Sequence, residues 1–174
     1  CITPEPGVHE VTYNSDFTYF LDKHSSINKV PVITLVGPGQ SKRILKDNAE
    51  LKAKMAEYKL SEFELFKVPN AEGTLLNGWL LKPRDFSEEN QYPLLMFQYS
   101  GPGSQSVTNQ FSIGYMWWYQ MLAQNGYIIV CVDGTGTGFR GEEFKKKTYL
   151  QLGKYESDDQ IAVAKYFAEQ PNVD

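Results

Sequence analysis

The stretch LLMFQYSGPGSQSVTNQFSIGYMWWYQMLAQNGYIIVCVD, residues 94–133, decides the fold. Residues 94–99 form an apolar run, as expected for a strand covered on both faces. Residues 113–124 are apolar nearly all round and predict a helix that Gly126 ends. Residues 127–132 predict a second buried strand. Strand, helix and strand in this order favour an α/β domain with a largely parallel sheet.

The flanking segments extend this pattern in both directions. Residues 62–68 and 75–82 predict a hairpin around a turn at residues 69–73. Residues 157–170 predict a helix that Ser157 and Gln160 begin as a capping box and that Pro171 ends. We expect its inward face to carry the apolar residues Ile161, Ala164, Phe167 and Ala168.

The first part of the chain is predicted to be antiparallel β structure. Residues 8–13, 17–22 and 32–36 are short runs of β-branched and aromatic residues separated by turn sequences. Three such strands cannot bury two faces alone, so they are typical of part of one blade of a larger β structure. Residues 47–58 then predict a helix, with Asp47 as N-cap and Glu50 three residues later.

Composition limits the possible function. The 174 residues are 41% hydrophobic and 22% charged, which suits a globular core, and the net charge of −4 argues against nucleic acid as a partner. No apolar run approaches the ~20 residues of a membrane span. Of the two cysteines, Cys131 lies in an apolar strand and is expected to be a buried thiol, whereas Cys1 cannot be placed. No Cys/His spacing suits zinc, and we expect neither a metal nor a cofactor.

A complete hydrolytic triad cannot be built from this sequence. It has no Gly-x-Ser-x-Gly elbow, and Ser104 lacks the second glycine that such an elbow needs. His9 and His24, the two histidines, fall in the β segment and are expected to be surface or turn residues. The nucleophile and base of a Ser-His-Asp set are therefore missing.

A glycine loop, residues 134–141, follows the second buried strand. Its residues 136–141 fit G-x-G-x-x-G, which would suggest a dinucleotide site. Against this, Glu142 and Glu143 begin the next segment and would repel a pyrophosphate. The alternative is a tight turn that Asp133 and Arg140 organise through hydrogen bonds.

Tyr99 is the candidate catalytic residue. It ends the first buried strand, and the carboxyl ends of such strands face the ligand crevice in open α/β sheets. A phenol is a neutral donor at pH 7 and can stabilise a developing oxyanion. The alternative is a core tyrosine whose hydroxyl is already satisfied.

Three motifs together resemble the dipeptidyl peptidase IV branch of the prolyl oligopeptidase family: residues 99–105 (YSGPGSQ), 132–138 (VDGTGTG) and 152–160 (LGKYESDDQ). The resemblance covers essentially the whole chain. It implies that residues 1–45 are the end of a β-propeller, residues 46–59 a linking helix, and residues 60–174 the first half of an α/β-hydrolase domain.

The resemblance also implies an activity. Members are serine exopeptidases that release N-terminal Xaa-Pro or Xaa-Ala dipeptides, and Tyr99 matches the family's oxyanion-stabilising tyrosine. The serine, aspartate and histidine would lie beyond the position of Asp174, so we expect an excised fragment that is inactive alone. The implied partners are peptide N-termini, the remaining propeller and hydrolase segments, and a second copy in a homodimer. The implied location is periplasmic, secreted or membrane-attached, although this sequence contains no signal peptide.

One departure and two alternatives stay open at this point. Thr135 stands where many relatives have arginine, which puts in doubt any salt bridge made there. The chain could instead be an interaction module, made adhesive by an exposed sheet edge after residues 127–132. It could also come from another α/β-hydrolase, such as an esterase or an acylaminoacyl peptidase.

Overall fold

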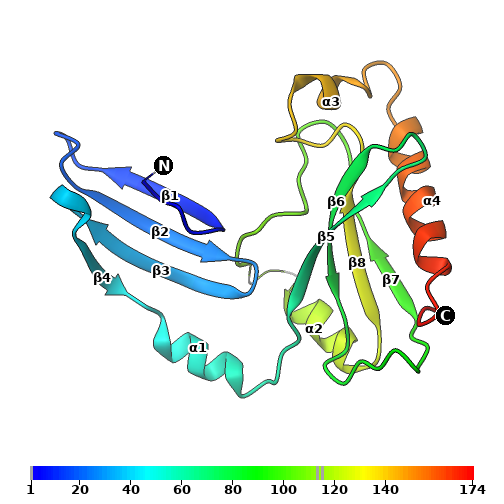
Figure 1. Ribbon diagram of the computed structural model, residues 1–174, viewed down its shortest axis with the longest axis horizontal. Coiled ribbons are helices and arrows are strands. Elements are labelled where there is room, and N and C mark those ends of the chain that lie inside the picture. The colour runs from blue at the N-terminus through cyan, green and yellow to red at the C-terminus, as the bar shows by residue number, and fades with distance from the viewer. Residues whose placement is uncertain (1, 113, 115) are drawn as a thin grey trace. The chain divides into compact units, whose positions relative to one another are not determined.

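The computed structural model describes residues 2–112, 114 and 116–174, and the chain divides into two compact units. Unit 1 comprises Cys1–Leu60 and Asn109–Tyr115, and unit 2 comprises Ser61–Thr108 and Met116–Asp174. Each unit contains one four-stranded sheet (Figure 1). The expected combination of α and β structure is therefore confirmed.

Unit 1 is an antiparallel meander in the order β1-β2-β3-β4, followed by one helix. Its elements are β1 (Val8–Tyr13), β2 (Phe20–Ser26), β3 (Lys29–Val36), the 3₁₀ turn η1 (Pro38–Gln40), β4 (Lys42–Lys46) and α1 (Ala49–Ala56). The apolar patterns predicted three strands and did not indicate the fourth, β4, because all five of its residues are exposed. The predicted second strand began too early, because Phe17 has a φ of 58° and belongs to the preceding turn.

The helix of unit 1 is shorter than predicted. Asn48 is the N-cap residue, and its side chain donates to the Pro31 carbonyl at 2.7 Å instead of capping the helix. The Asp47 carboxylate still accepts a hydrogen bond from the backbone N–H of Ala49 at 3.1 Å. Asp47, which the sequence predicted as the N-cap, therefore lies one residue before the N-cap and still stabilises the start of the helix.

Unit 2 alternates strands and helices around a mixed sheet in the order β5-β6-β8-β7. Its elements are β5 (Phe63–Pro69), β6 (Leu75–Leu81), β7 (Leu94–Phe97), α2 (Met116–Gln124), β8 (Ile128–Asp133), α3 (Glu142–Lys146) and α4 (Lys154–Ala168). The predicted hairpin is confirmed as β5 and β6. The predicted helix start at residue 113 lies outside the described residues.

The expectation of a largely parallel sheet is wrong for the described residues. The pairings β5–β6 and β6–β8 are antiparallel, and only β7–β8 is parallel. A hairpin turn forces its two strands to run in opposite directions, whereas only the strand–helix–strand crossover through α2 returns the chain in the same direction.

The expected free edge at the second buried strand is also wrong. β8 lies between β6 and β7, and all six of its residues are buried. β7 is the strand at the edge. Beside its start, Tyr92 forms a parallel bridge with Val173, in which Tyr92 donates to the Asn172 carbonyl at 3.1 Å and accepts from Asp174 at 3.0 Å.

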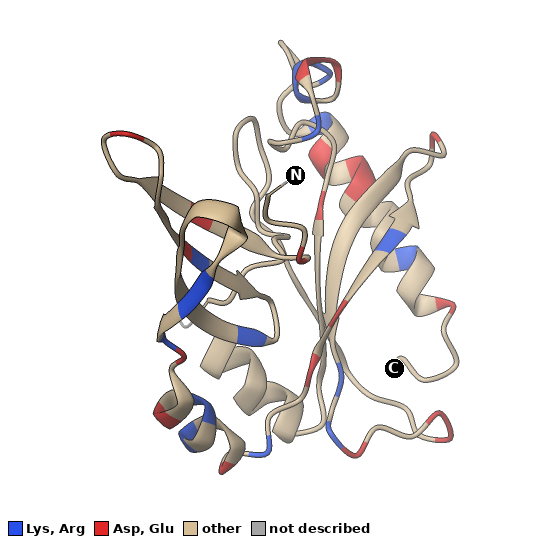
Figure 2. Ribbon diagram, turned by 60° about the vertical axis from the view of Figure 1, so that its left-hand side comes forward, with Lys and Arg blue, Asp and Glu red and all other residues tan. Residues whose placement is uncertain are grey.

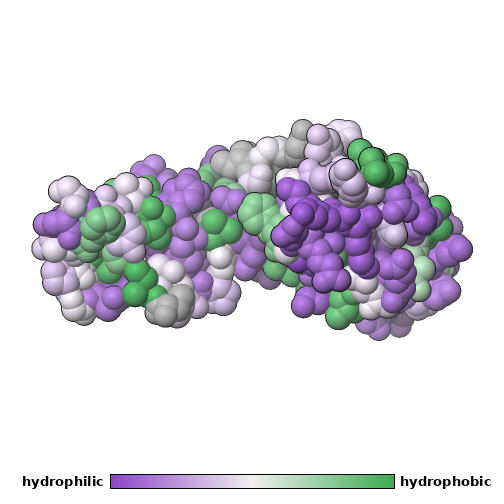
Figure 3. Space-filling view, turned by 90° about the horizontal axis from the view of Figure 1, so that it is seen from above, coloured by the Kyte–Doolittle hydropathy of each residue, from purple (hydrophilic) through white to green (hydrophobic). Residues whose placement is uncertain are grey.

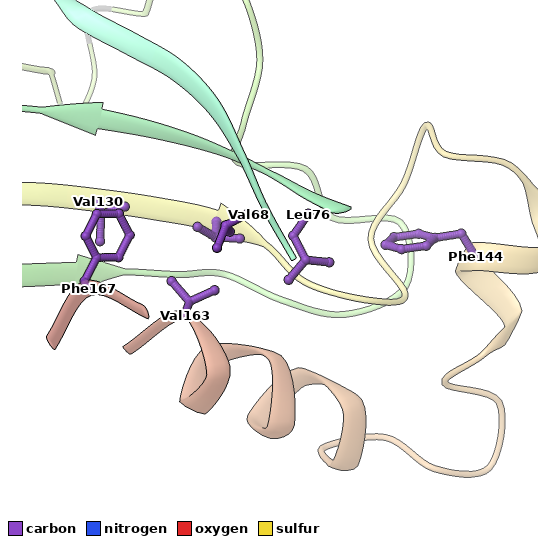
Figure 4. Packing of buried hydrophobic residues seen from close by; sticks show 7 residues of the cluster. Val68, Leu76, Val130, Phe144, Val163 and Phe167 are labelled. Atoms are coloured by element: carbon purple, nitrogen blue, oxygen red, sulfur yellow. The ribbon is translucent and has the colours of Figure 1, made fainter. Parts of the chain in front are cut away.

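The core of unit 2 lies between the sheet and α4. Side chains from β5, β6, β8 and the two following helices meet there (Figure 4): Val68, Leu76, Val130, Val132, Phe144, Val163 and Phe167. Gly78 belongs to this packing, because a Cβ there would lie 2.4 Å from the ring of Phe66. Phe66 in turn meets Phe167 edge-on at 5.8 Å. Full burial of each such side chain contributes about 1.5–3 kcal/mol.

The face that α4 turns inward differs from the prediction. The buried residues are Asp159, Val163 and Phe167, spaced four apart, whereas Ile161 is 53% exposed and Ala168 is exposed. The helix begins at Lys154, so Ser157 lies inside it, and the Gly153 N–H donates to Glu156 at 2.9 Å. The carboxylates of α4 gather in its first two turns (Figure 2), where the helix dipole favours negative charge.

The opposite face of the sheet packs against α2. Trp79 of β6 and Tyr119 of α2 have ring centroids 5.2 Å apart, and Trp79 lies opposite Cys131 in the β6–β8 register. Cys131 is a free thiol with 1% exposure, as expected. The buried side-chain amide of Gln120 both accepts from and donates to the backbone of Ser61, at 2.9 and 2.8 Å. Among the described helices, none has the length and apolar character that crossing a bilayer requires.

Candidate functional site

The candidate site lies where β7 and β8 end. These strands are parallel, so their carboxyl ends meet at one edge of the sheet. The tyrosine loop (residues 98–107) follows β7, and the glycine loop (residues 134–141) follows β8 and leads into α3 (Figure 1). Segments separated in sequence by all of α2 are thereby brought together.

Tyr99 stands two residues beyond β7 with its side chain in solvent. It is 71% exposed, and its phenol has no hydrogen-bond partner in the described part of the chain. The alternative of a core tyrosine with a satisfied hydroxyl is therefore wrong. The phenol is free to donate to a ligand, and its oxyanion role stays a prediction.

Asp133, the last residue of β8, holds the tyrosine loop. Its two carboxylate oxygens accept the backbone N–H groups of Ser106 and Val107, each at 2.9 Å. Asp133 is 4% exposed, and this burial raises the pKa of its carboxyl, against the opposing effects of the two N–H groups and of Arg140. The carboxylate therefore organises the tyrosine loop, whereas the sequence predicted that it would organise the glycine loop.

A tight turn closes the first half of the tyrosine loop. The backbone N–H of Ser104 and its hydroxyl both donate to the Gly101 carbonyl, at 3.1 and 2.8 Å. The Ser104 carbonyl accepts from the Gly138 N–H at 2.8 Å. Ser104, considered as a nucleophile from the sequence, is thus engaged in holding the turn to the glycine loop.

A second buried carboxylate, Asp159 of α4, was missed by the sequence analysis. One of its oxygens accepts from the backbone N–H of Thr135 at 2.6 Å, and the other accepts from the Asn70 side chain at 2.8 Å. Asn70 itself orders the β5–β6 turn through the backbone N–H groups of Glu72 and Thr74. The available signal was the i, i+4, i+8 spacing of Asp159 with Val163 and Phe167, which places a carboxylate on an apolar face.

The dinucleotide alternative for the glycine loop is wrong. Acceptors within the protein already occupy three of its backbone N–H groups: Thr135 donates to Asp159, Thr137 to Gly134, and Gly138 to Ser104. The following helix, α3, has only five residues, and α4 comes next where a dinucleotide-binding unit needs a strand.

Arg140 fastens the end of the glycine loop to the hairpin. Its guanidinium donates to the Leu75 carbonyl at 2.7 Å and lies over the Phe144 ring, 4.1 Å from the ring centroid. The predicted organising role is thus fulfilled, but through β6 and α3 and not through a bond within the loop.

A groove of about 960 Å³ is lined by Pro102 of the tyrosine loop and by residues of the segment around α3. Large apolar side chains are exposed on this segment: Phe139, Tyr149, Leu150 and Leu152. Figure 3 looks onto the end of unit 2 that carries α3, where hydrophobic atoms stand beside strongly hydrophilic ones. The groove gives the edge of the sheet an apolar surface for a ligand.

The two histidines lie in unit 1, far along the chain from this edge. His9 and His24 are paired residues of β1 and β2 whose ring centroids stack 4.2 Å apart, so they lie in strands and not in turns, and both are partly exposed, in keeping with the expected surface positions. His9 is half-buried and contacts the Asp22 carboxylate at 2.9 Å. Unit 2 therefore has no histidine to activate a serine, and among the described residues no group of three or more His, Cys, Asp or Glu could hold a metal.

The chain is similar in sequence and in structure to known peptidases. The sequence profile of the Prolyl oligopeptidase family matches residues 113–174. The structure of Porphyromonas gingivalis dipeptidyl peptidase 4 superposes on 99% of the chain with a TM-score of 0.92 and 38% sequence identity. The chain belongs to the prolyl oligopeptidase family, in its dipeptidyl peptidase IV branch.

Curated relatives in this family agree. Probable dipeptidyl-aminopeptidase B of Pyrenophora teres f. teres is 34% identical over 97% of the chain, and its counterpart in Fusarium vanettenii is 37% identical over 84%. The chain spans only 20% and 16% of these two relatives, and 24% of the P. gingivalis structure.

Thr135, at which the resemblance implied a departure from the family pattern, is buried. Thr135 is 1% exposed, and its contact with Asp159 uses only the backbone N–H. That hydrogen bond does not depend on the side chain that residue 135 carries.

Proposed function

We propose that this chain is part of a serine exopeptidase that releases Xaa-Pro or Xaa-Ala dipeptides from peptide N-termini. The observation that carries the proposal is the exposed phenol of Tyr99 at the carboxyl end of the unit 2 sheet, which has no hydrogen-bond partner among the described residues. Family membership supports it, because the named relatives are dipeptidyl peptidases.

The proposed domain organisation follows the two kinds of sheet. Residues 1–45 are the end of a β-propeller, and the four-stranded antiparallel meander of unit 1 is the form that propeller blades take. Residues 46–59 link it to the catalytic domain. Residues 60–174 are the first half of an α/β-hydrolase domain, supported by the β7–α2–β8 crossover.

Tyr99 is proposed to act on the charge that forms during acyl transfer. A serine attacks the carbonyl carbon of the second residue, its proton passes to a histidine, and the carbonyl oxygen becomes an oxyanion. The Tyr99 hydroxyl and one backbone N–H donate to that oxygen. When the tetrahedral intermediate collapses, the amine leaves with the proton and the serine ester remains for water to hydrolyse.

The bridge between Tyr92 and Val173 supports a position for the nucleophile. Val173 pairs in parallel with Tyr92, just before β7. A strand that continued from Val173 in parallel with β7 would finish at the carboxyl end of the sheet, where Tyr99 lies. The proposed serine would then follow that strand and face the phenol.

Two proteins test the proposal: the 174-residue chain and the longer protein that carries it. Each is incubated with a glycyl-prolyl chromogenic substrate and with a fluorophosphonate probe that labels active serines. We expect turnover and labelling by the longer protein and neither by the chain. Labelling of the chain would refute its inactivity, and a longer protein that cleaves esters but not the dipeptidyl substrate would indicate another α/β-hydrolase.

A further inference from the structure

We propose that Asp133 is a positioning residue, and that its two hydrogen bonds to the tyrosine loop fix the direction in which Tyr99 presents its phenol. This inference rests on the proposed function of Tyr99. Asp133 does not reach the reacting atoms, so it acts only through the loop.

The first step is the bidentate contact. Asp133 accepts the N–H of Ser106 through Oδ1 and that of Val107 through Oδ2. The two N–H groups are bound by different oxygens, and a carboxylate offers two acceptor oxygens whereas an amide offers one. An asparagine would turn an NH₂ group toward one of the two N–H donors and break that bond.

The second step is that this carboxylate serves no ion pair. Asp133 is buried, with 4% exposure, and none of the ion pairs among the described residues includes it. A buried carboxylate without an ion pair is unfavourable unless hydrogen bonds compensate it. Its charge is therefore directed onto the loop backbone, which it draws against the end of β8.

The third step connects these anchors to Tyr99. Trp79 donates to the Ser106 carbonyl at 3.2 Å, and the glycine loop holds Ser104, which closes the turn on Gly101. Tyr99 thus lies between two fixed points, the end of β7 at Phe97 and the closed turn at Gly101. Without the two Asp133 bonds, residues 104–107 would be held only by Gly138 and Trp79, and we expect the Gly101 turn, and with it the phenol, to shift.

The test is a double-mutant cycle in the longer protein, using Asp133→Asn, Tyr99→Phe and the double variant, with Asp158→Asn as the control at an exposed aspartate. We expect Asp133→Asn to lower kcat by up to about 100-fold, since a displacement near 1 Å can have that effect, with KM changed less than threefold. In the Tyr99→Phe background it should lower kcat no further. Asp158→Asn should leave both constants unchanged.

The alternatives give different patterns. If Asp133 is merely structural, its effect on kcat will be the same with and without the Tyr99 hydroxyl, and the positioning role is refuted while the peptidase activity stands. If the wild-type longer protein has no dipeptidyl peptidase activity, the proposed function fails. The 174-residue chain then decides the positioning claim alone: Asp133→Asn should shift the ring resonances of Tyr99 and speed amide exchange at Ser106 and Val107, and unchanged spectra would overturn it.

A folding defect does not leave the question open. Asp133→Glu keeps both acceptors on a side chain one CH₂ longer, and it replaces Asp133→Asn if the latter does not fold. We expect an intermediate loss of kcat that again disappears in the Tyr99→Phe background. A loss that persists there contradicts the proposal.

Discussion

The carboxylate of Asp159 lies 2.6 Å from the backbone nitrogen of Thr135, a residue 24 positions earlier in the chain. Its other oxygen accepts from the Asn70 side chain, so one buried group joins α4, the glycine loop and the β5–β6 turn. Asp159 thus holds the glycine loop, while Asp133 holds the tyrosine loop that carries Tyr99. The candidate site is therefore assembled by two acidic residues that take no part in the proposed chemistry.

Replacement of Asp159 by asparagine should destabilise unit 2. The amide cannot accept from both Thr135 and Asn70, and a buried donor left without an acceptor costs about 1–3 kcal/mol. We expect the free energy of unfolding in urea to fall by about 2–3 kcal/mol. The neighbouring Asp158→Asn, on the exposed side of α4, should stay within about 0.5 kcal/mol of wild type. Equal effects of the two substitutions would contradict the role given to Asp159.

Gly136→Ala should disturb the glycine loop by two separate effects. Gly136 has a φ of 97°, and a Cβ there would lie 2.5 Å from Cγ2 of Thr148. Backbone strain and overpacking together predict a loss of about 2–4 kcal/mol in unfolding free energy.

Gly141→Ala separates these two effects. Its φ of 89° is similar, but no atom lies within 4 Å of the added Cβ. Only backbone strain remains, since a ψ of 168° places Gly141 in a region that is nearly exclusive to glycine, and we expect a loss of about 1–3 kcal/mol. If thermal unfolding finds Gly141→Ala as damaging as Gly136→Ala, the close approach of Thr148 is not what makes position 136 intolerant.

How far the sequence predicted the structure depends on the range of the interactions. The strands β1, β5, β6 and β8 were found because their apolar patterns are local. Tyr99 was predicted as the last residue of a strand that ends two residues earlier, at Phe97. The buried face of α4 was mistaken because it begins with a carboxylate, Asp159, whose partners lie 24 and 89 residues away. Sequence patterns do not contain such long-range contacts. For the same reason, the hydrogen bonds of Asp133 were assigned to the glycine loop and not to the tyrosine loop.

The stability of unit 1 should fall as the pH rises. Burial alone lowers the pKa of His9, but hydrogen bonds to the Glu5 carbonyl and the Asp22 carboxylate outweigh it and raise the pKa above its ordinary value of 6.5. A raised histidine pKa stabilises the folded state below pH 6.5, and this contribution is lost as the pH passes through the folded value. Stacked His24 and the Glu5–Lys42 ion pair complete the surroundings of the ring.

This pH dependence can be isolated by substitution. Urea unfolding of the wild type at pH 5.5 and pH 8 should differ by about 1 kcal/mol or less, with the greater stability at pH 5.5. His9→Gln and Asp22→Asn should both reduce the difference. A difference that survives both substitutions must come from other groups.

The central claim is that Tyr99 stabilises an oxyanion, and steady-state kinetics of Tyr99→Phe in the longer protein test it most directly. Loss of one oxyanion donor typically lowers kcat by about 10²–10³. We predict a decrease of that size on a glycyl-prolyl substrate, with the thermal unfolding midpoint unchanged because the side chain of Tyr99 is 71% exposed. A Tyr99→Phe variant that folds normally and retains wild-type kcat would contradict the account.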